Sequence, residues 1–302
     1  MNQTPFRRRQ HFLSFAIATA LATIPGTAPA AMVQELTPVP LASLVDHNIS
    51  QLGATALGIH PADWKHAETA NFVYHFINNF IAAPVSVEAE FYYRVYAKDL
   101  NRDTTQWERK SHIYIFETSQ DWAEFQRKAS LDPWTGGIHS NNDLFIIRNR
   151  EYKFKGHSLG HEISHLVFHR FFGNGIPLWL NEGYAEYSSK RAYTSFMRAR
   201  NYMVRQSSPL IPEQDLIPLN VLADLSTYPS DEHKVEVFYT ESEKLVRFLG
   251  TEDKLKLVEL VDLLSKGNRF ESALWKSYGS RFASLDALQT EFKTYAAKNL
   301  EN

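Results

Sequence analysis

The pentapeptide HEISH, from His161 to His165, constrains this chain more than any other feature of its sequence. Residues four apart share one face of an α-helix, so the two imidazoles would project the same way, one turn apart. That separation suits two nitrogen ligands of one zinc ion. Glu162 lies about 100° further round the helix, where a carboxylate can hold a water molecule beside a metal without binding the metal. Because such a short motif also arises by chance, an ordinary helix with a polar stripe is the alternative.

A second segment supplies the missing ligand. A zinc site of this kind needs a third protein ligand, and a carboxylate on another helix can provide it. Glu182 lies in NEGYAEY, and the intervening residues 173–177 read GNGIP. Glycine and proline there predict that the first helix ends, the chain turns and a second helix begins. The two facing helices predict one zinc ion per chain, held by His161, His165 and Glu182.

Three further side chains continue the same spacing. His169 lies two turns from His161, about 12 Å by helix rise, which is too far to bind the same ion. His157 falls at the start of the helix. We expect both outer histidines to be hydrogen-bonded or surface residues. Glu186, one turn after Glu182, is expected to accept the N–H of a zinc-bound histidine, with a solvated helix charge as the alternative.

The two-part motif resembles a known family. HEISH followed by PLWLNEGYAEY is similar to the gluzincin metallopeptidases, and most of all to the bacterial peptidase MA-like proteins and the aminopeptidase N catalytic domain. Flanking segments extend the resemblance over about residues 66–249. It implies a zincin-like α+β fold, zinc on the two histidines and on the N-E-G glutamate, and Glu162 as the general base. Only a faint echo of the aminopeptidase GAMEN sequence occurs, Gly136 to Ile138, so an endopeptidase or another amidase is as compatible.

The resemblance also implies a donor for the oxyanion. Gluzincins usually place a tyrosine or histidine from the C-terminal lobe beside the substrate carbonyl oxygen. Tyr239, in FYTESEKLV, has the corresponding position and is assigned a catalytic role on that basis. His233 is the rival. The alternative for Tyr239 is a packed aromatic ring whose hydroxyl makes only a local hydrogen bond.

Hydrophobic periodicity indicates an α+β fold with two lobes. The pattern predicts a small αβ lobe over residues 66–190, which ends with the two motif helices, and a helical lobe over residues 191–302. A loosely ordered lead-in, residues 31–65, precedes them. Within the αβ lobe we expect strands in 71–78 and 111–118, two short strands around an asparagine turn in 136–149, a helix after Pro84 and a helix capped by Ser119. The strand Asp143–Ile147 is expected to pair with an extended peptide at the sheet edge.

The N-terminus has the pattern of an export signal. Arg7–Arg9 are followed by an apolar core, Phe12–Ile24, which is too short to span a bilayer, and by small residues at Ala28–Ala30. We therefore predict a signal peptide, residues 1–30, a periplasmic or secreted protein of a bacterium, and no stable membrane anchor after cleavage. A retained membrane anchor is the alternative, and the Sec and twin-arginine routes both stay open.

Composition narrows the chemistry. The chain has no cysteine, so it forms no disulfide and any metal must be held by histidine and carboxylate groups. The net charge is −2, and no basic patch lies outside the N-terminus, so nucleic acid is not an expected partner.

These features together predict an exported zinc metallopeptidase with a peptide or protein substrate. Zinc would activate a water molecule, and Glu162 would take its proton and pass it to the leaving amine. An envelope hydrolase acting on peptidoglycan peptides or another amide is a second interpretation of the same site. A zinc-stabilised binding or assembly protein is a third, although a purely structural site does not need Glu162 and usually has four protein ligands.

Overall fold

The computed structural model of the chain describes residues 36–103, 109–131, 136–149 and 156–301. The described residues all belong to one compact unit. The expected signal peptide, residues 1–30, lies outside the described residues. Among the helices that are described, none is both long enough and apolar enough to cross a membrane.

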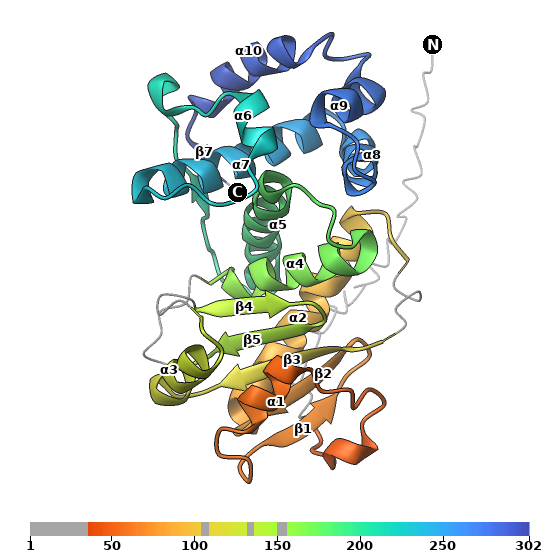
Figure 1. Cartoon of the computed structure of the whole chain (residues 1–302), viewed down its shortest axis with the longest axis vertical. Helices are drawn as coiled ribbons and strands as arrows, with labels where there is room; N and C mark the ends of the chain where they lie inside the picture. Colours follow the sequence, from red (N-terminus) through yellow and green to blue (C-terminus); the bar gives the residue numbers. More distant parts are fainter. Residues whose placement is uncertain (1–35, 104–108, 132–135, 150–155, 302) are drawn as a thin grey trace, which may run out of the picture. The chain divides into compact units, whose positions relative to one another are not determined.

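A five-stranded mixed sheet forms one layer of the fold (Figure 1). Its inner strands are parallel and its two edge strands are antiparallel to their neighbours. Every residue of the three inner strands is buried, because helices cover both faces, as parallel strands require. In spatial order the strands are β1 (Lys65–Glu68), β2 (Phe72–Phe76), β3 (Ser111–Phe116), β5 (Asp143–Ile147) and β4 (Gly137–Ser140).

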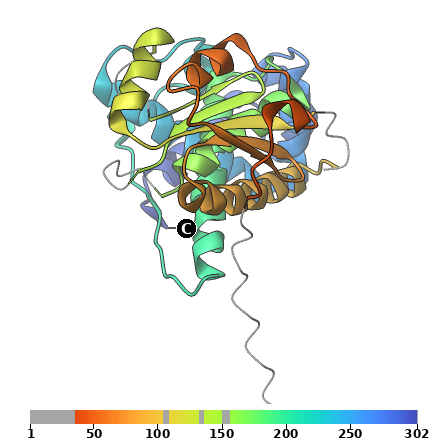
Figure 2. The same cartoon turned by 90° about the horizontal axis from the view of Figure 1, so that it is seen from below.

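Helices cover both faces of the sheet, and each face has its own hydrophobic core. The face with Tyr74 and Ile113 packs on α2 (Asn79–Asp99) and α4 (Ser158–Phe172). The face with Tyr114 and Phe145 packs on the small helices α1 (Gln51–Leu57) and α3 (Ser119–Lys128). Figure 2 shows this division, with the orange helix α2 on one side of the strands and the red α1 and yellow α3 on the other. The alternation of side chains along each strand separates the two cores.

The C-terminal half is helical, as the periodicity predicts. Helix α7 (Glu232–Glu252) packs on α5 (Leu178–Arg198), which in turn packs on α4. Gly183 allows α5 and α7 to approach closely, since a Cβ at that position would lie 2.3 Å from the backbone oxygen of Ser242. The other elements are the 3₁₀ turns Leu41–Ser43 and Glu213–Asp215, β6 (Ser207–Ser208), α6 (Leu219–Asp224), α8 (Lys254–Ser265), α9 (Phe270–Tyr278), α10 (Leu285–Ala296) and β7 (Leu300–Glu301).

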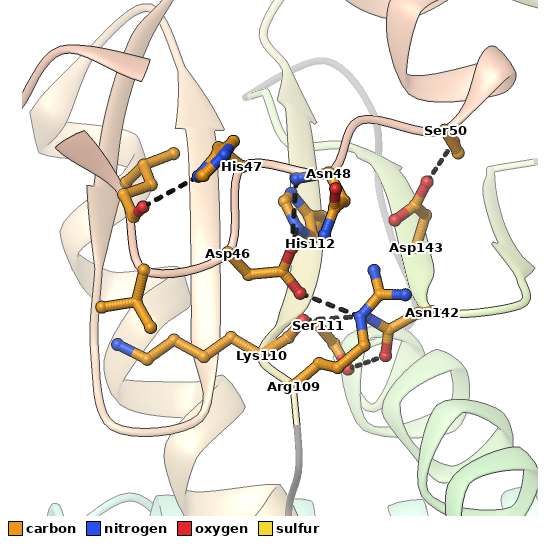
Figure 3. A network of polar contacts seen from close by, with 12 residues as sticks. Asp46, His47, Asn48, Ser50, Arg109, Lys110, Ser111, His112, Asn142 and Asp143 are labelled. Carbon is orange, nitrogen blue, oxygen red and sulfur yellow. Dashed lines mark hydrogen bonds and ion pairs between the residues drawn. The ribbon is translucent and has the colours of Figure 1, made fainter. Parts of the chain in front are cut away.

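The lead-in is more ordered than its sequence suggests, so the expectation of a loose segment over residues 31–65 is wrong for its described part. Ser50 caps α1 and its hydroxyl also donates a hydrogen bond to Asp143 on β5. Asp46 accepts a hydrogen bond of 3.0 Å from Nε of Arg109 (Figure 3). These long-range polar contacts fasten the lead-in across the outer face of the sheet, and local sequence patterns do not reveal them.

A chain of histidines crosses the same face of the sheet. His66 and His75 lie side by side on β1 and β2, with their Nδ1 atoms 2.8 Å apart. Nε2 of His75 lies 2.9 Å from Nδ1 of His112 on β3, and Nε2 of His112 lies 3.7 Å from Asp46. His75 also stacks on Tyr114, with ring centroids 4.3 Å apart. Burial lowers the pKa of all three histidines, so they pack as neutral rings.

Two predicted helix starts are corrected. Helix α2 begins at Asn79 and contains Pro84, because the Asn78 side chain caps it by accepting a hydrogen bond from the Phe80 amide. Proline removes the partner of the Phe80 carbonyl, but the Phe80 side chain is 88% exposed, so water can reach this turn. Thr118, one residue before the expected Ser119, caps α3 through the amide of Asp121.

The boundary expected between residues 190 and 191 falls inside α5, which continues to Arg198. The helix therefore joins the sheet-bearing part to the C-terminal helices. The two strands predicted around an asparagine turn are confirmed as β4 and β5, and Asn141 adopts a left-handed φ of 53° between them.

Candidate metal centre and active site

Helix α4 is fixed by apolar residues on its inner side and by a close contact with α2. Leu159, Ile163 and Val167 are fully buried. At Gly160 the absence of a side chain lets α2 approach, and Tyr96 donates a hydrogen bond of 3.0 Å to the Gly160 carbonyl oxygen. The packing leaves His161 and His165 partly exposed on another side of the helix.

The predicted break between the two motif helices is confirmed. Helix α4 ends at Phe172, followed by Gly173 with a φ of 71°. Such a conformation strains side chains with a Cβ, so glycine suits this helix end. Pro177 precedes the first residue of α5, where a fixed φ suits the start of a helix. The turn sends α5 back along α4.

The turn brings the three predicted ligands together. The Nε2 atoms of His161 and His165 are 3.0 Å apart. Oε2 of Glu182 lies 3.4 Å from the first and 3.6 Å from the second. In the part of the chain that the structure describes, these residues form the one group of histidine and carboxylate side chains with metal-binding spacing.

The other ring nitrogens of both histidines face acceptors. Nδ1 of His165 lies 3.0 Å from Oδ1 of Asn181, and Nδ1 of His161 lies 3.1 Å from Oε1 of Glu186. A hydrogen bond from Nδ1–H leaves Nε2 with a lone pair, which then points into the cluster. The surroundings therefore favour the tautomer that binds a metal.

The cluster fits a tetrahedral cation. Three atoms with lone pairs face one another, and Oε2 of Glu182 is buried and receives no hydrogen bond from the described residues. A proton or a metal ion must offset their mutual repulsion. Metal–ligand bonds of about 2.0–2.1 Å in a tetrahedron place ligand atoms about 3.3 Å apart, close to the separations of 3.0, 3.4 and 3.6 Å. The spacing of these atoms suits a small tetrahedral metal ion.

Without a metal, a proton on His161 offsets the repulsion between the three facing atoms. Burial by itself lowers the pKa of His161, but the nearby carboxylates of Glu182 and Glu186 raise it well above the usual value. Burial opposes ionisation of Glu182, yet the nearby histidines and Tyr228 hold its pKa at about 2. His161 therefore carries a positive charge between two carboxylates, and a metal must displace that proton.

Glu162 lies in a cleft of about 860 Å³ that is also lined by His161, Glu186 and Tyr239. Burial raises the pKa of Glu162. The edge strand β4 packs against the Glu162 side chain. A Cβ at Gly137 would lie 3.1 Å from the Glu162 Cγ. Glu162 and His161 thus line the same cleft.

The two candidates for the oxyanion donor, Tyr239 and His233, differ in their position relative to the cleft. Tyr239 on α7 is half-buried and lines the cleft beside Glu162. His233 is 65% exposed and lies 3.8 Å from Asp215, and it is not among the residues that line this cleft. The helical turn carries it to another side of α7, so the structure gives no support to His233 as the rival donor.

Three contacts of the site were not predicted from the sequence. Asn181 adjoins Glu182 in the motif, so its role could have been noticed. Tyr228 donates a hydrogen bond of 2.6 Å to Oε1 of Glu182 from a loop before α7. Lys190 lies 3.0 Å from Glu186 and 2.9 Å from the fully buried Glu243. The i, i+4 spacing of Glu186 and Lys190 is a local signal, but no local pattern points to Tyr228 or to the contact of Lys190 with Glu243, because these contacts join segments far apart in the sequence.

The outer histidines differ from each other. His157 is buried and its Nε2 lies 3.8 Å from Oε2 of Glu186. His169 is bonded to Asn174 at 2.7 Å, away from the cluster. His139 on β4 packs near His169, with ring centroids 5.6 Å apart. None of the three belongs to the ligand cluster.

The expected peptide-binding strand is corrected. Asp143–Ile147 is β5, which pairs with β3 on one side and β4 on the other. It therefore has no free edge. Among the described strands, β4 is the edge strand on this side of the sheet, and it is the strand next to Glu162.

Comparison with known families agrees with this geometry. The sequence model of the Peptidase MA superfamily matches residues 96–297. The chain belongs to this superfamily. The match includes α4, α5 and the described C-terminal helices α6 to α10, so it extends well beyond the two motifs. No curated protein matches the chain.

Membership in the Peptidase MA superfamily supports a peptidase with a metallopeptidase-type site and agrees with the zincin-like α+β fold. The resemblance to gluzincin peptidases is confirmed at the level of the superfamily. The His161, His165 and Glu182 group is where such a protein could hold its metal.

Proposed function

We propose that this chain is a zinc metallopeptidase that hydrolyses peptide bonds. The observation that carries the proposal is the convergence of two Nε2 atoms and one carboxylate oxygen, with both Nδ1 atoms facing acceptors. Two imidazoles and a carboxylate, without thiolates and with room for a fourth ligand, are typical of catalytic zinc. We infer that His161, His165 and Glu182 hold one zinc ion per chain.

The neighbouring side chains have separate roles in this proposal. Zinc supplies positive charge that activates water and polarises a carbonyl group. Glu162 accepts the proton of the attacking water and delivers it to the leaving amine. Tyr239 donates a hydrogen bond to the developing oxyanion from the opposite wall of the cleft. Glu186 and Asn181 hold the two ligand rings in orientation.

An extended peptide is the substrate class that the cleft suits best. Strand β4 leaves one side of its backbone unpaired among the described residues, and its Gly137 is next to Glu162. A peptide that pairs with this edge would pass the proposed base. We therefore propose that the peptide pairs with β4 and not with β5 (Asp143–Ile147).

Export completes the proposal. The basic, apolar and small-residue regions of residues 1–30 support cleavage after Ala30 and a periplasmic or secreted enzyme. N-terminal sequencing of protein recovered from the cell envelope tests this step. A chain that begins at Met1 there would contradict it.

The function is tested with the mature chain, loaded with zinc, on a library of peptides derived from a whole proteome. We expect cleavage by the wild type and none by Glu162→Gln. Peptidoglycan peptides and other amides are included, since the same site could hydrolyse them. A zinc-loaded chain that cleaves no substrate would instead indicate a binding or assembly protein.

The ligand set is tested separately by metal content. Replacing His161, His165 or Glu182 by alanine should sharply lower the zinc retained after dialysis. Full zinc content in Glu182→Ala would show that another carboxylate is the third ligand, with Glu186 the nearest candidate.

A further inference from the structure

The two oxygens of the Glu182 carboxylate face different partners. Oε2 faces the Nε2 atoms of His161 and His165, at 3.4 and 3.6 Å. Oε1 accepts a hydrogen bond of 2.6 Å from the Tyr228 hydroxyl. The carboxylate is buried, so each oxygen has a distinct environment.

Tyr228 comes from a segment that is distant in sequence. It lies between α6 and α7, and its side chain is 48% exposed at the rim of the site. Its ring stacks on Tyr239, with centroids 5.9 Å apart and planes at 18°, and meets the buried Phe238 edge-on at 6.0 Å. These aromatic contacts fix the ring, so the hydroxyl reaches Glu182 in one defined direction.

A phenol hydroxyl is a donor and an ionised carboxylate only accepts, so in this contact Tyr228 donates and Glu182 accepts. A hydrogen bond to a charged acceptor is stronger than one between neutral groups.

We propose that Tyr228 is a positioning residue that reserves one oxygen of Glu182 for the metal. By binding Oε1, its hydroxyl keeps the carboxylate from rotating and directs Oε2 at the two histidines. The proposal rests on the metal site proposed above, and it assigns the third ligand a partner outside the two motif helices. Asn181 and Glu186 serve the histidines in the same way from α5 itself.

The two stacked tyrosines then have different tasks. Tyr228 contacts the ligand carboxylate, whereas Tyr239 lines the cleft beside Glu162. Loss of the Tyr228 hydroxyl should weaken metal binding. Loss of the Tyr239 hydroxyl should instead slow turnover.

The test measures the zinc dissociation constant of the full mature chain by competition with a chromophoric chelator. We expect Tyr228→Phe to bind zinc about 10–100-fold more weakly, as is typical when a partner of a metal ligand is lost. Tyr228→Phe keeps the ring and its stacking, so the comparison isolates the hydroxyl. Tyr202→Phe is the matched control, because Tyr202 is 60% exposed and lies outside the site, and it should bind zinc as the wild type does.

Thermal unfolding of the metal-free proteins accompanies the titration. Equal unfolding midpoints for the wild type and Tyr228→Phe, together with weaker zinc binding, support the positioning role. Equal zinc affinities would overturn it while leaving the proposed metal site intact. A wild-type chain that binds no zinc would overturn both. An equal loss of affinity in Tyr202→Phe would also overturn the assignment, since the effect would then not come from the contact with Glu182.

Discussion

Nδ1 of His161 lies 3.1 Å from Oε1 of Glu186, and the other oxygen of Glu186 lies 3.0 Å from Nζ of Lys190. Lys190 in turn contacts Glu243 of α7 at 2.9 Å. A chain of alternating charges therefore runs from the metal cluster on α4, along α5, to a fully buried carboxylate on α7. Such partners fix the orientation of a ligand ring and adjust its basicity.

Removing the charge of Glu186 should weaken metal binding. We expect Glu186→Gln to lower zinc affinity about 10–100-fold, because the amide is a poorer acceptor for Nδ1–H and no longer balances Lys190. Chelator competition measures the change. Glu271→Gln, on the exposed side of α9, is the control. Unchanged affinity in Glu186→Gln would show that the His161 ring is held by its packing alone.

Glu162→Gln should separate metal binding from chemistry. Glutamine keeps the shape of the side chain but cannot take a proton, so kcat should fall about 10²–10⁴-fold while zinc content stays constant. Peptide hydrolysis and metal analysis on the same preparation check both points. Near-normal turnover would remove Glu162 from the mechanism.

Tyr239→Phe should slow turnover without loss of metal. Losing one donor to the oxyanion typically lowers kcat about 10²–10³-fold. His233→Ala is the paired variant and should turn over normally, because the side chain is largely exposed and lies beside Asp215. The reverse outcome would return the role to His233 and require α7 to be turned in the substrate complex.

Zinc binding should release protons. The raised pKa of His161 keeps that ring protonated at neutral pH when no metal is present, whereas Glu182, with a pKa of about 2, is already ionised. We expect about one proton to be released per zinc ion at pH 7, so zinc affinity should fall as the pH is lowered. Calorimetric titration in buffers of different ionisation enthalpy counts the protons. A value of zero would show that the metal-free cluster carries no proton.

The buried histidine chain should make the fold sensitive to acid. Burial lowers the pKa of His75 in the folded protein, so below about pH 6.5 the unfolded chain binds a proton that the folded chain does not. Stability should therefore fall as the pH drops from 7.5 to 6. Other titrating groups also make the free energy of unfolding depend on pH. The wild type is therefore compared with His75→Phe. We expect the variant to be less stable overall but to lose about 0.8 kcal/mol less between pH 7.5 and 6, as measured by urea unfolding. The same pH dependence of stability in both proteins would show that His75 does not cause the sensitivity to acid.

The convergence of the three proposed ligands could be predicted because they are close together along the chain. Two histidines one turn apart, a glycine–proline break and a carboxylate on the next helix leave little freedom, and His161, His165 and Glu182 converge as expected. The αβ and helical halves also followed from hydrophobic periodicity.

What the sequence could not supply depends on contacts across the chain. The order of the strands decided that β4, rather than Asp143–Ile147, lies at the edge. The contact between Tyr228 and Glu182 joins a loop to a helix, and the lead-in owes its order to Asp46 and Ser50 meeting strands far away in sequence. Charged and hydroxyl side chains in such loops look like ordinary solvated residues until the fold places them.

Gly183 follows the proposed ligand Glu182 directly, and it has no side chain where α5 meets α7. Even a single methyl group would collide with the backbone of α7 at Ser242, and a helix backbone cannot move aside as a flexible side chain can. The helices would have to separate, and α7 carries Tyr239 on the far wall of the cleft. The position of Tyr239 in the cleft thus depends on the missing Cβ of Gly183. A substitution at Gly183 would displace Tyr239 although every residue that lines the cleft remained in the sequence.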